Sequence, residues 1–110
     1  DNAIVVMTQA ADASGEGRDY FKLAQIYTER QEWSKSLEFS NKALNAGDLK
    51  APYQALIIKG LAQYNLDELE SASITFFKAA SYPAAEKVAH QWQEYIESEQ
   101  QRREYIANAG

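Results

Sequence analysis

Residues 20–44 contain two apolar helical patterns separated by a few polar residues. In the first pattern, large side chains alternate with a small one at helical spacing: Tyr20, Leu23, Ala24 and Tyr27. This spacing places large and small side chains together on one face of a helix. Because the second pattern follows after so short a polar stretch, the sequence predicts a helix–turn–helix hairpin.

The small residues of this hairpin recur at the same intervals further along the chain. Ala24 and Ser36 lie 12 residues apart, since 36 − 24 is 12. Gly60 and Ala72 also lie 12 residues apart, and the step from Ala24 to Gly60 is 60 − 24, or 36 residues. Small residues at repeated positions let two helices approach closely. The intervals therefore predict a second hairpin built like the first.

Helix periodicity and helix-ending residues divide the whole chain into helical segments. The expected helices cover residues 2–13, 19–30, 33–46, 52–65, 68–81 and 84–107. Asp19 is expected to cap the second of these, while Gly15 and Gly47 are suited to end helices. Pro52 and Pro83 are expected in first helical turns, where a missing N–H is tolerated. No segment shows the alternation of a strand, so the predicted fold class is all-α.

The first of these segments shows one apolar stripe, formed by Ala3, Ile4, Met7, Ala10 and Ala11. Ala3 and Ala10 lie 7 residues apart, because 10 − 3 is 7, and both hairpins show this interval in their second helices. We interpret residues 1–14 as the second helix of a repeat whose first helix is missing.

The two hairpins together resemble the tetratricopeptide repeat (TPR), whose unit of ~34 residues follows the pattern W-x₂-L-G-x₂-Y…A-x₃-F…P. The first hairpin supplies Tyr20, Leu23, Ala24, Tyr27, Ser36 and Ala43, and the second supplies Leu56, Gly60, Ala72, Phe76 and Ala79. The resemblance covers residues 2–85. It implies a right-handed superhelix of antiparallel helix hairpins with a long C-terminal capping helix. The single domain 1–110 then divides into residues 1–14, a first repeat 17–50, a second repeat 53–82 and the capping helix 83–107.

Several positions depart from the TPR pattern. Ser36 and Ser40 replace an Ala and an aromatic residue, Lys59 stands where Leu is usual, and Gln63 stands where Tyr is usual. Asp48 occupies the place of the terminal Pro in the first repeat.

A narrower resemblance concerns residues 49–55, 59–66 and 89–99. These stretches are similar to the end of a group of bacterial TPR proteins described as periplasmic components of a TonB energy-transduction system. That similarity implies the C-terminal part of a longer exported protein and a periplasmic location; without it, a cytoplasmic location is expected. The chain begins at Asp1 rather than Met, as a fragment or a processed product would.

Composition narrows the classes of partner. The formal net charge is −5, so the chain lacks the basic surface that nucleic-acid binding requires, and we expect no nucleic-acid partner. An acidic surface favours a neutral or basic protein segment instead. The absence of cysteine excludes disulfides and thiolate sites. No run of 18 apolar residues is present, so no membrane span is expected.

The sequence offers no catalytic or metal-binding motif. His90 is the only histidine, and its nearest candidate partners on one helix face are Glu86 and Glu94. Because one histidine beside two carboxylates is more often an exposed helix face than a site, we predict no enzyme, no cofactor and no metal. In the tail, Glu99 is expected to pair with Arg102 and Arg103.

The resemblance to TPR proteins places the candidate binding residues on the inner concave surface. They are Phe21, Gln25, Thr28, Glu29, Ile57, Leu61, Tyr64, Asn65, His90 and Glu94. The aromatic residues Tyr20, Tyr27, Trp33, Phe76 and Trp92 are assigned to the core instead. The predicted function is non-catalytic binding of a peptide or partner protein in this groove. The alternative is a structural C-terminal cap or self-association module of a longer solenoid, in which the exposed edges pair as a homodimer.

Overall fold

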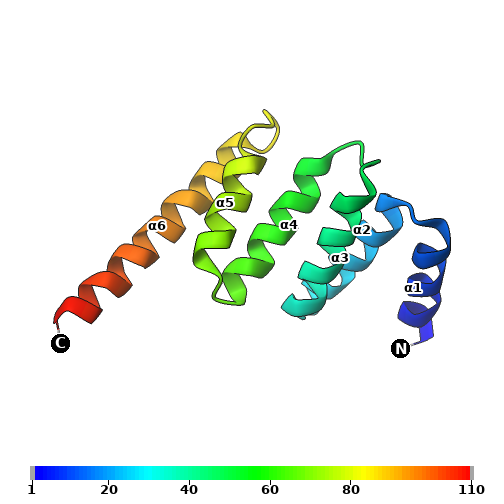
Figure 1. The fold of residues 1–110 in the computed structure, drawn as a ribbon, viewed down its shortest axis with the longest axis horizontal. Helices are drawn as coiled ribbons and strands as arrows, with labels where there is room; N and C mark the ends of the chain where they lie inside the picture. Colours follow the sequence, from blue (N-terminus) through cyan, green and yellow to red (C-terminus); the bar gives the residue numbers. More distant parts are fainter. Residues whose placement is uncertain (1, 110) are drawn as a thin grey trace.

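The computed structural model describes residues 2–109, and this part of the chain folds into six α-helices without a strand. The helices are α1 (Asn2–Ser14), α2 (Gly17–Glu29), α3 (Trp33–Ala46), α4 (Pro52–Asn65), α5 (Leu69–Ala79) and α6 (Glu86–Ala109). The all-α prediction is confirmed (Figure 1). None of the six helices is both long enough and apolar enough to cross a membrane.

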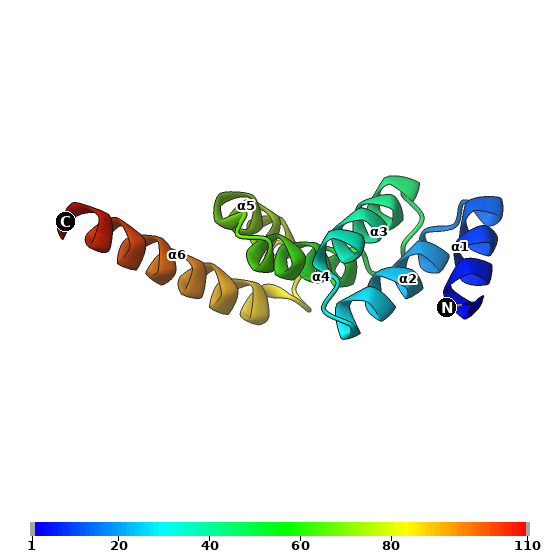
Figure 2. The ribbon, with the colours of Figure 1, turned by 90° about the horizontal axis from the view of Figure 1, so that it is seen from below.

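Each helix packs on the helix that follows it in the chain, and α2 also contacts α4. Figure 2 shows α3 and α5 in one row and α2, α4 and α6 in a second row. Because contacts join neighbours in the chain, the molecule is elongated, with extents of 52 × 32 × 18 Å. The C-terminal half of α6 projects beyond the other helices (Figure 1).

The turns that connect α2 to α3 and α4 to α5 have the same backbone structure. Gln31 and Asp67, which lie 67 − 31, or 36, residues apart, adopt left-handed φ angles of 59° and 66°. The next N–H in each turn donates to a carbonyl five residues earlier: Glu32 to Tyr27 at 2.9 Å, and Glu68 to Gln63 at 2.8 Å. This bonding is the Schellman helix ending, which satisfies the last carbonyls of a helix.

Most of the buried apolar residues form two clusters. The N-terminal cluster consists of Ile4, Ala11, Leu23, Ala24 and Phe39, from α1, α2 and α3. The C-terminal cluster consists of Leu56, Leu69, Ala72, Phe76, Ala79, Ala85, Ala89 and Ile96, from α4 to α6. Alanines contribute much of both clusters, so the helices approach closely and larger side chains fill the remaining space.

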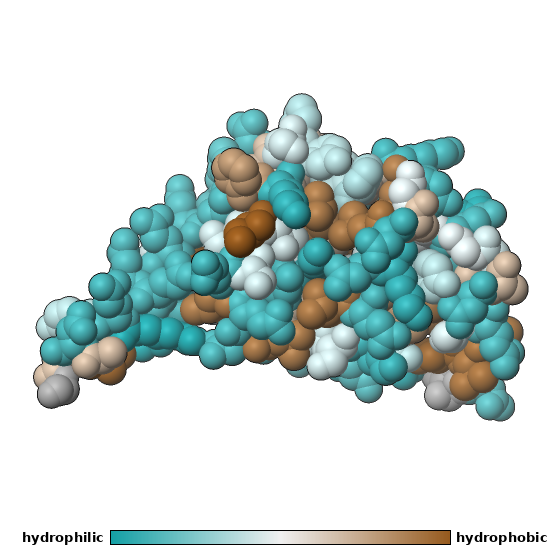
Figure 3. Space-filling model, in the orientation of Figure 1, coloured by the Kyte–Doolittle hydropathy of each residue, from teal (hydrophilic) through white to brown (hydrophobic). Residues whose placement is uncertain are grey.

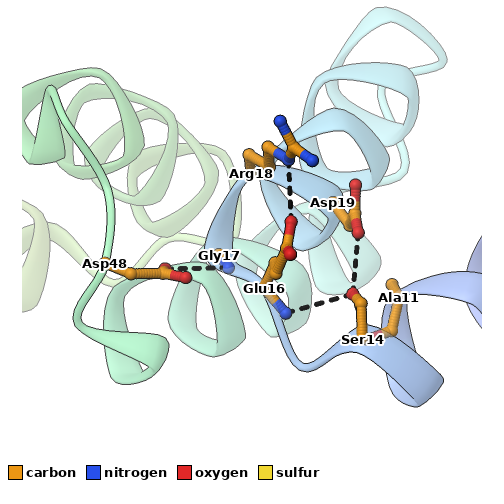
Figure 4. Close-up of polar contacts among 7 residues, drawn as sticks. All are labelled: Ala11, Ser14, Glu16, Gly17, Arg18, Asp19 and Asp48. Atoms are coloured by element: carbon orange, nitrogen blue, oxygen red, sulfur yellow. Dashed lines mark hydrogen bonds and ion pairs between the residues drawn. The ribbon is translucent and has the colours of Figure 1, made fainter.

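The start of α2 differs from the prediction. Asp19 does not cap the helix; its carboxylate accepts a hydrogen bond from the Ser14 hydroxyl at 2.7 Å. The first N–H of α2, on Gly17, instead donates to Asp48 Oδ1 at 2.9 Å (Figure 4). A Cβ on Gly17 would lie 2.5 Å from that oxygen and 2.9 Å from the Ala43 carbonyl oxygen. Only glycine fits here, because a backbone carbonyl cannot move aside.

Other helix boundaries also shift. The last helix starts at Glu86 rather than residue 84, and Pro83 lies in the turn before it. That turn is held by backbone bonds, including one from the Ala85 N–H to the Tyr82 carbonyl at 2.9 Å. In α1, Ala3 and Ala10 are exposed, so the predicted stripe is wrong at these two positions. Its buried residues are Ile4 and Ala11, which are also 11 − 4, or 7, residues apart.

The remaining helix-ending predictions agree with the structure. Gly15 and Gly47 adopt φ angles of 67° and 76° after α1 and α3. Pro52 is the first residue of α4.

Candidate functional site

A cavity of about 550 Å³ opens between α4 and α6. Its lining residues are Leu61, Tyr64 and Asn65 of α4, Gln91, Trp92 and Tyr95 of α6, and Trp33 of α3. Aromatic side chains therefore form most of its wall. Asn65 is held in position by a hydrogen bond from its Nδ2 to the Leu61 carbonyl oxygen at 2.9 Å.

A second cavity of about 390 Å³ lies between α2, α4 and the start of α6. Its lining residues are Phe21 and Gln25 of α2, Tyr53, Gln54, Ile57 and Ile58 of α4, and Ala84, Ala85 and Val88 beside or on α6. Ile57 and Leu61 are one turn apart on α4, and Val88 and Gln91 are one turn apart on α6. The two cavities are thus consecutive along the same pair of helices, and we call their combined lining the α4–α6 groove.

Three aromatic rings of the α4–α6 groove pack on one another. The ring centroid of Tyr64 lies 5.4 Å from that of Trp92 and 5.5 Å from that of Tyr95. Trp92 and Tyr95 meet edge to face, with centroids 5.7 Å apart and ring planes at 85°. Trp92 also stacks on the buried ring of Phe76, with centroids 5.4 Å apart and planes at 3°. The groove wall is therefore fixed to the core by aromatic stacking, a favourable geometry.

Tyr95 also controls the ionisation of Tyr64. The pKa of the Tyr64 phenol is raised to about 12, first by the hydrogen bond with Tyr95 and then by burial. The negative charge of Glu99 adds to the rise, and the positive charge of Arg103 opposes it. Tyr64 therefore stays protonated to a higher pH than an ordinary tyrosine, whose pKa is 10.0.

A network of charged residues lies beyond the aromatic rings. Glu99 accepts hydrogen bonds from Arg102 Nε at 3.1 Å and Arg103 Nε at 3.0 Å, which confirms the predicted pairs. These two arginines lower the pKa of Glu99 to about 2. Arg103 also reaches Asp67, in the turn between α4 and α5, with 2.7 Å between Nη1 and Oδ1. The network joins α6 to that turn, and the negative charges of Glu99 and Asp67 balance the positive charges of Arg102 and Arg103.

The structure brings six of the ten predicted site residues into the α4–α6 groove. These are Phe21, Gln25, Ile57, Leu61, Tyr64 and Asn65. The other four lie elsewhere. Thr28 faces α3, where its hydroxyl is 2.6 Å from the Ser36 hydroxyl and 2.8 Å from the Ala24 carbonyl oxygen. Glu29 is exposed near the end of α2.

His90 and Glu94 also lie outside the two cavities, although α6 borders both. Successive residues of an α-helix are rotated by about 100°, so His90 lies about 200° around the helix from Val88. Both His90 and Glu94 are exposed. Within the described residues no group of three or more His, Asp or Glu side chains is arranged to hold a metal ion.

Several groove residues were not among the predicted site residues. Trp33 and Trp92 were assigned to the core, yet both are only half-buried and line the larger cavity. Tyr95, which is 55% exposed, was not assigned to the site from the sequence. The size of tryptophan is the signal that could have identified the first two, because so large a side chain is rarely covered completely.

The lining of the α4–α6 groove offers both apolar and hydrogen-bonding groups. The α4–α6 groove combines aromatic and aliphatic side chains with four amides: Gln25, Gln54, Asn65 and Gln91. Amides can both donate and accept hydrogen bonds, as a peptide backbone requires. In comparisons with known proteins, no family model, no curated protein and no solved structure matched this chain.

Proposed function

We propose that the protein is a non-catalytic scaffold of TPR type that binds an uncharged, apolar segment of a partner protein in the α4–α6 groove. The hairpins α2–α3 and α4–α5 would be its repeats within a right-handed superhelix, and α6 would be its capping helix. The similarity to TonB-associated TPR proteins extends the proposal to a complex of the bacterial envelope.

The chemistry of the groove lining is the observation that carries this proposal. Among the described residues that line the two cavities, none is charged, although the whole chain carries a net charge of −5. A charged ligand side chain would lose hydration there without gaining an ionic partner. Apolar ligand side chains would displace water from Leu61, Ile57 and the aromatic rings. The four amides would meet the polar groups of the ligand backbone.

The fixed position of the aromatic wall supports binding as well. Tyr64, Trp92 and Tyr95 hold one another at ring distances of 5.4–5.7 Å, and Trp92 is stacked on Phe76. Side chains that are already ordered lose little conformational freedom when a ligand binds. Aromatic residues of this kind are enriched among the residues that dominate binding energy at protein interfaces.

A displayed library of random peptides, selected on the wild-type protein, tests the proposal. We expect the selected peptides to be rich in aliphatic and aromatic residues and poor in charged ones. Leu61→Arg should weaken their binding by at least about tenfold, because the new charge must be dehydrated when the peptide covers it. Fluorescence anisotropy with a labelled selected peptide measures the change.

Two glutamine substitutions of the same chemistry provide the matched control. Gln91→Glu adds one negative charge inside the groove, whereas Gln100→Glu adds the same charge at an exposed position further along α6. Only the first should weaken binding. Equal binding by wild type and L61R, or equal effects of Q91E and Q100E, would place the peptide elsewhere and contradict the proposal. Circular dichroism verifies that each variant is folded.

A further inference from the structure

The opposite side of α4 carries a second cleft, which the proposed groove does not use. This cleft has a volume of about 580 Å³ and runs between α3 and α5, with α4 as its floor. Its α4 residues include Leu56 and Lys59, whereas the α4–α6 groove uses Ile57 and Leu61. We call it the α3–α5 cleft.

Lys59 occupies a position where the first hairpin has a core residue. Lys59 and Leu23 are 59 − 23, or 36, residues apart, the interval that relates the two hairpins. Leu23 is completely buried, with 0% exposure. Lys59 is half-buried, and its side chain lines the α3–α5 cleft. Replacing an apolar core residue by lysine places an ammonium group where hydration is incomplete, which is unfavourable unless the charge finds a partner.

A second lysine lines the same cleft. Lys78 of α5 is close enough that its charge, together with the larger effect of burial, lowers the pKa of Lys59. Within residues 2–109, neither ammonium group makes a hydrogen bond or an ion pair with a protein group. Two like charges therefore share one cleft in a chain whose net charge is −5. An anion placed between them would relieve their repulsion.

The rest of the cleft is mainly apolar. Leu44, Leu56, Phe77 and Tyr82 contribute to its lining, and Phe77 is 70% exposed at α5. Figure 3 shows a hydrophobic patch on the surface over α5, the helix that also carries the exposed Ile74. A ligand that complements both the two lysines and the apolar residues of this cleft needs a negatively charged group and an apolar body.

We infer that the α3–α5 cleft is a binding site for a small organic carboxylate, whose charged group lies between Lys59 and Lys78 and whose hydrocarbon part covers Leu56 and Phe77. Charge-assisted hydrogen bonds from two ammonium groups supply the selectivity for the anion. The apolar lining supplies affinity in proportion to the area that it covers. The site is independent of the peptide groove, because it uses the other face of α4.

Titration with sodium hexanoate, followed by amide NMR shifts, tests this inference, and hexan-1-ol serves as the uncharged comparison. Hexanoate should perturb α4 and α5 around Lys59 and Lys78 in a saturable manner, and hexan-1-ol should bind at least about tenfold more weakly. Lys59→Met and Lys78→Met should each weaken hexanoate binding by about tenfold or more. Lys87→Met, which removes an exposed lysine of α6 outside the cleft, should leave binding unchanged.

Three results would overturn the inference: no saturable binding of hexanoate to the folded wild-type protein, equal affinity for hexan-1-ol, or equal weakening by K59M and K87M. Loss of folding does not obscure the test, because Met keeps the length and apolar stem of lysine. Lys59→Leu gives a second variant, which restores the residue of the first hairpin and should also weaken hexanoate binding by about tenfold or more. If peptide binding in the α4–α6 groove fails, the result for hexanoate is unaffected.

Discussion

The ring of Phe76 lies directly against the backbone of Gly60. A Cβ built on Gly60 would be 2.7 Å from both Cε2 and Cζ of that ring, closer than real Cβ contacts allow. Phe76 is completely buried, and its ring also stacks on that of Trp92. In the first hairpin the equivalent positions are Ala24 and Ser40, so the larger side chain of α5 is matched by the smaller residue of α4.

Gly60→Ala should therefore destabilise the protein, although alanine normally favours a helix. The helical preference for alanine contributes about 1 kcal/mol, whereas overpacking a rigid core costs about 1–3 kcal/mol. The difference between these two effects is a net loss of up to about 2 kcal/mol in the free energy of unfolding. In a Phe76→Leu background the ring is absent, and G60A should instead be neutral or stabilising. Urea denaturation of the four proteins measures this; the same effect of G60A in both backgrounds would contradict the steric explanation.

The hydrogen bond between Thr75 and Gln63 replaces an aromatic pair of the first hairpin. Thr75 Oγ1 donates to Gln63 Oε1 at 2.6 Å, and both side chains are buried. The corresponding residues of the first hairpin lie 36 positions earlier: Tyr27, since 63 − 36 is 27, and Phe39, since 75 − 36 is 39. The rings of Tyr27 and Phe39 stack with centroids 5.6 Å apart. The glutamine that departs from the TPR pattern is thus accompanied by a matching change in the facing helix.

Thr75→Val should cost about 1–3 kcal/mol in the free energy of unfolding, because it leaves the buried Gln63 oxygen without its donor. The double variant Gln63→Leu, Thr75→Val removes both polar groups, and we expect it to be more stable than T75V alone. Thermal and urea unfolding of the single and double variants complete a double-mutant cycle. Additive losses would show that the hydrogen bond does not couple the two residues.

The left-handed residues of the two hairpin turns provide a matched pair of substitutions. Gln31→Gly should raise the free energy of unfolding by up to about 1 kcal/mol, because glycine adopts positive φ without steric strain. Asp67→Gly relieves the same strain but also removes the ion pair between Asp67 and Arg103. Because both side chains are exposed, this ion pair contributes at most about 1 kcal/mol to stability. D67G should therefore stabilise the protein less than Q31G. Urea denaturation measures both, and a loss of stability in Q31G would contradict the interpretation of strain.

Local sequence features were sufficient to predict most of the fold. Apolar spacing located all six helices, and glycine or proline marked the ends that depend on local backbone geometry, as at Gly47 and Pro52. The prediction was wrong where a distant residue decides the structure. The first N–H of α2 is capped by Asp48, 31 residues further along, and no local pattern around Asp19 could indicate that.

The candidate site was predicted less completely, for a related reason. Leu61, Tyr64 and Asn65 were assigned to the site from the resemblance to TPR proteins, and all three line the larger cavity. The contribution of α6 depends on how that helix is rotated against α4 and α5, which its own periodicity does not determine. His90 and Glu94 were therefore chosen, whereas Gln91 and Tyr95 line the cavity.

The ionisation of Tyr64 provides a pH test of the aromatic wall. Folding raises the pKa of the Tyr64 phenol from its ordinary value of 10.0 to about 12. As the pH rises, Tyr64 therefore loses its proton in the unfolded chain before it does so in the folded protein. Stability from this group is therefore complete below about pH 10 and is lost as the pH rises towards about 12. Tyr95→Phe removes the largest cause of the rise, so the pKa of Tyr64 should fall, while the smaller influences of Glu99 and Arg103 remain.

The chain has seven tyrosines, so the titration of Tyr64 must be isolated by difference. Near-ultraviolet absorbance of the wild type minus that of Tyr64→Phe gives its curve, and the same subtraction in the Y95F background gives the shifted one. Tyr105→Phe, at a side chain that is 76% exposed in the C-terminal half of α6, is the control and should leave the difference curve unchanged. An unchanged pKa in Y95F would mean that the two hydroxyls do not share a hydrogen bond in solution. The ordered wall on which peptide binding depends would then lack one of its contacts.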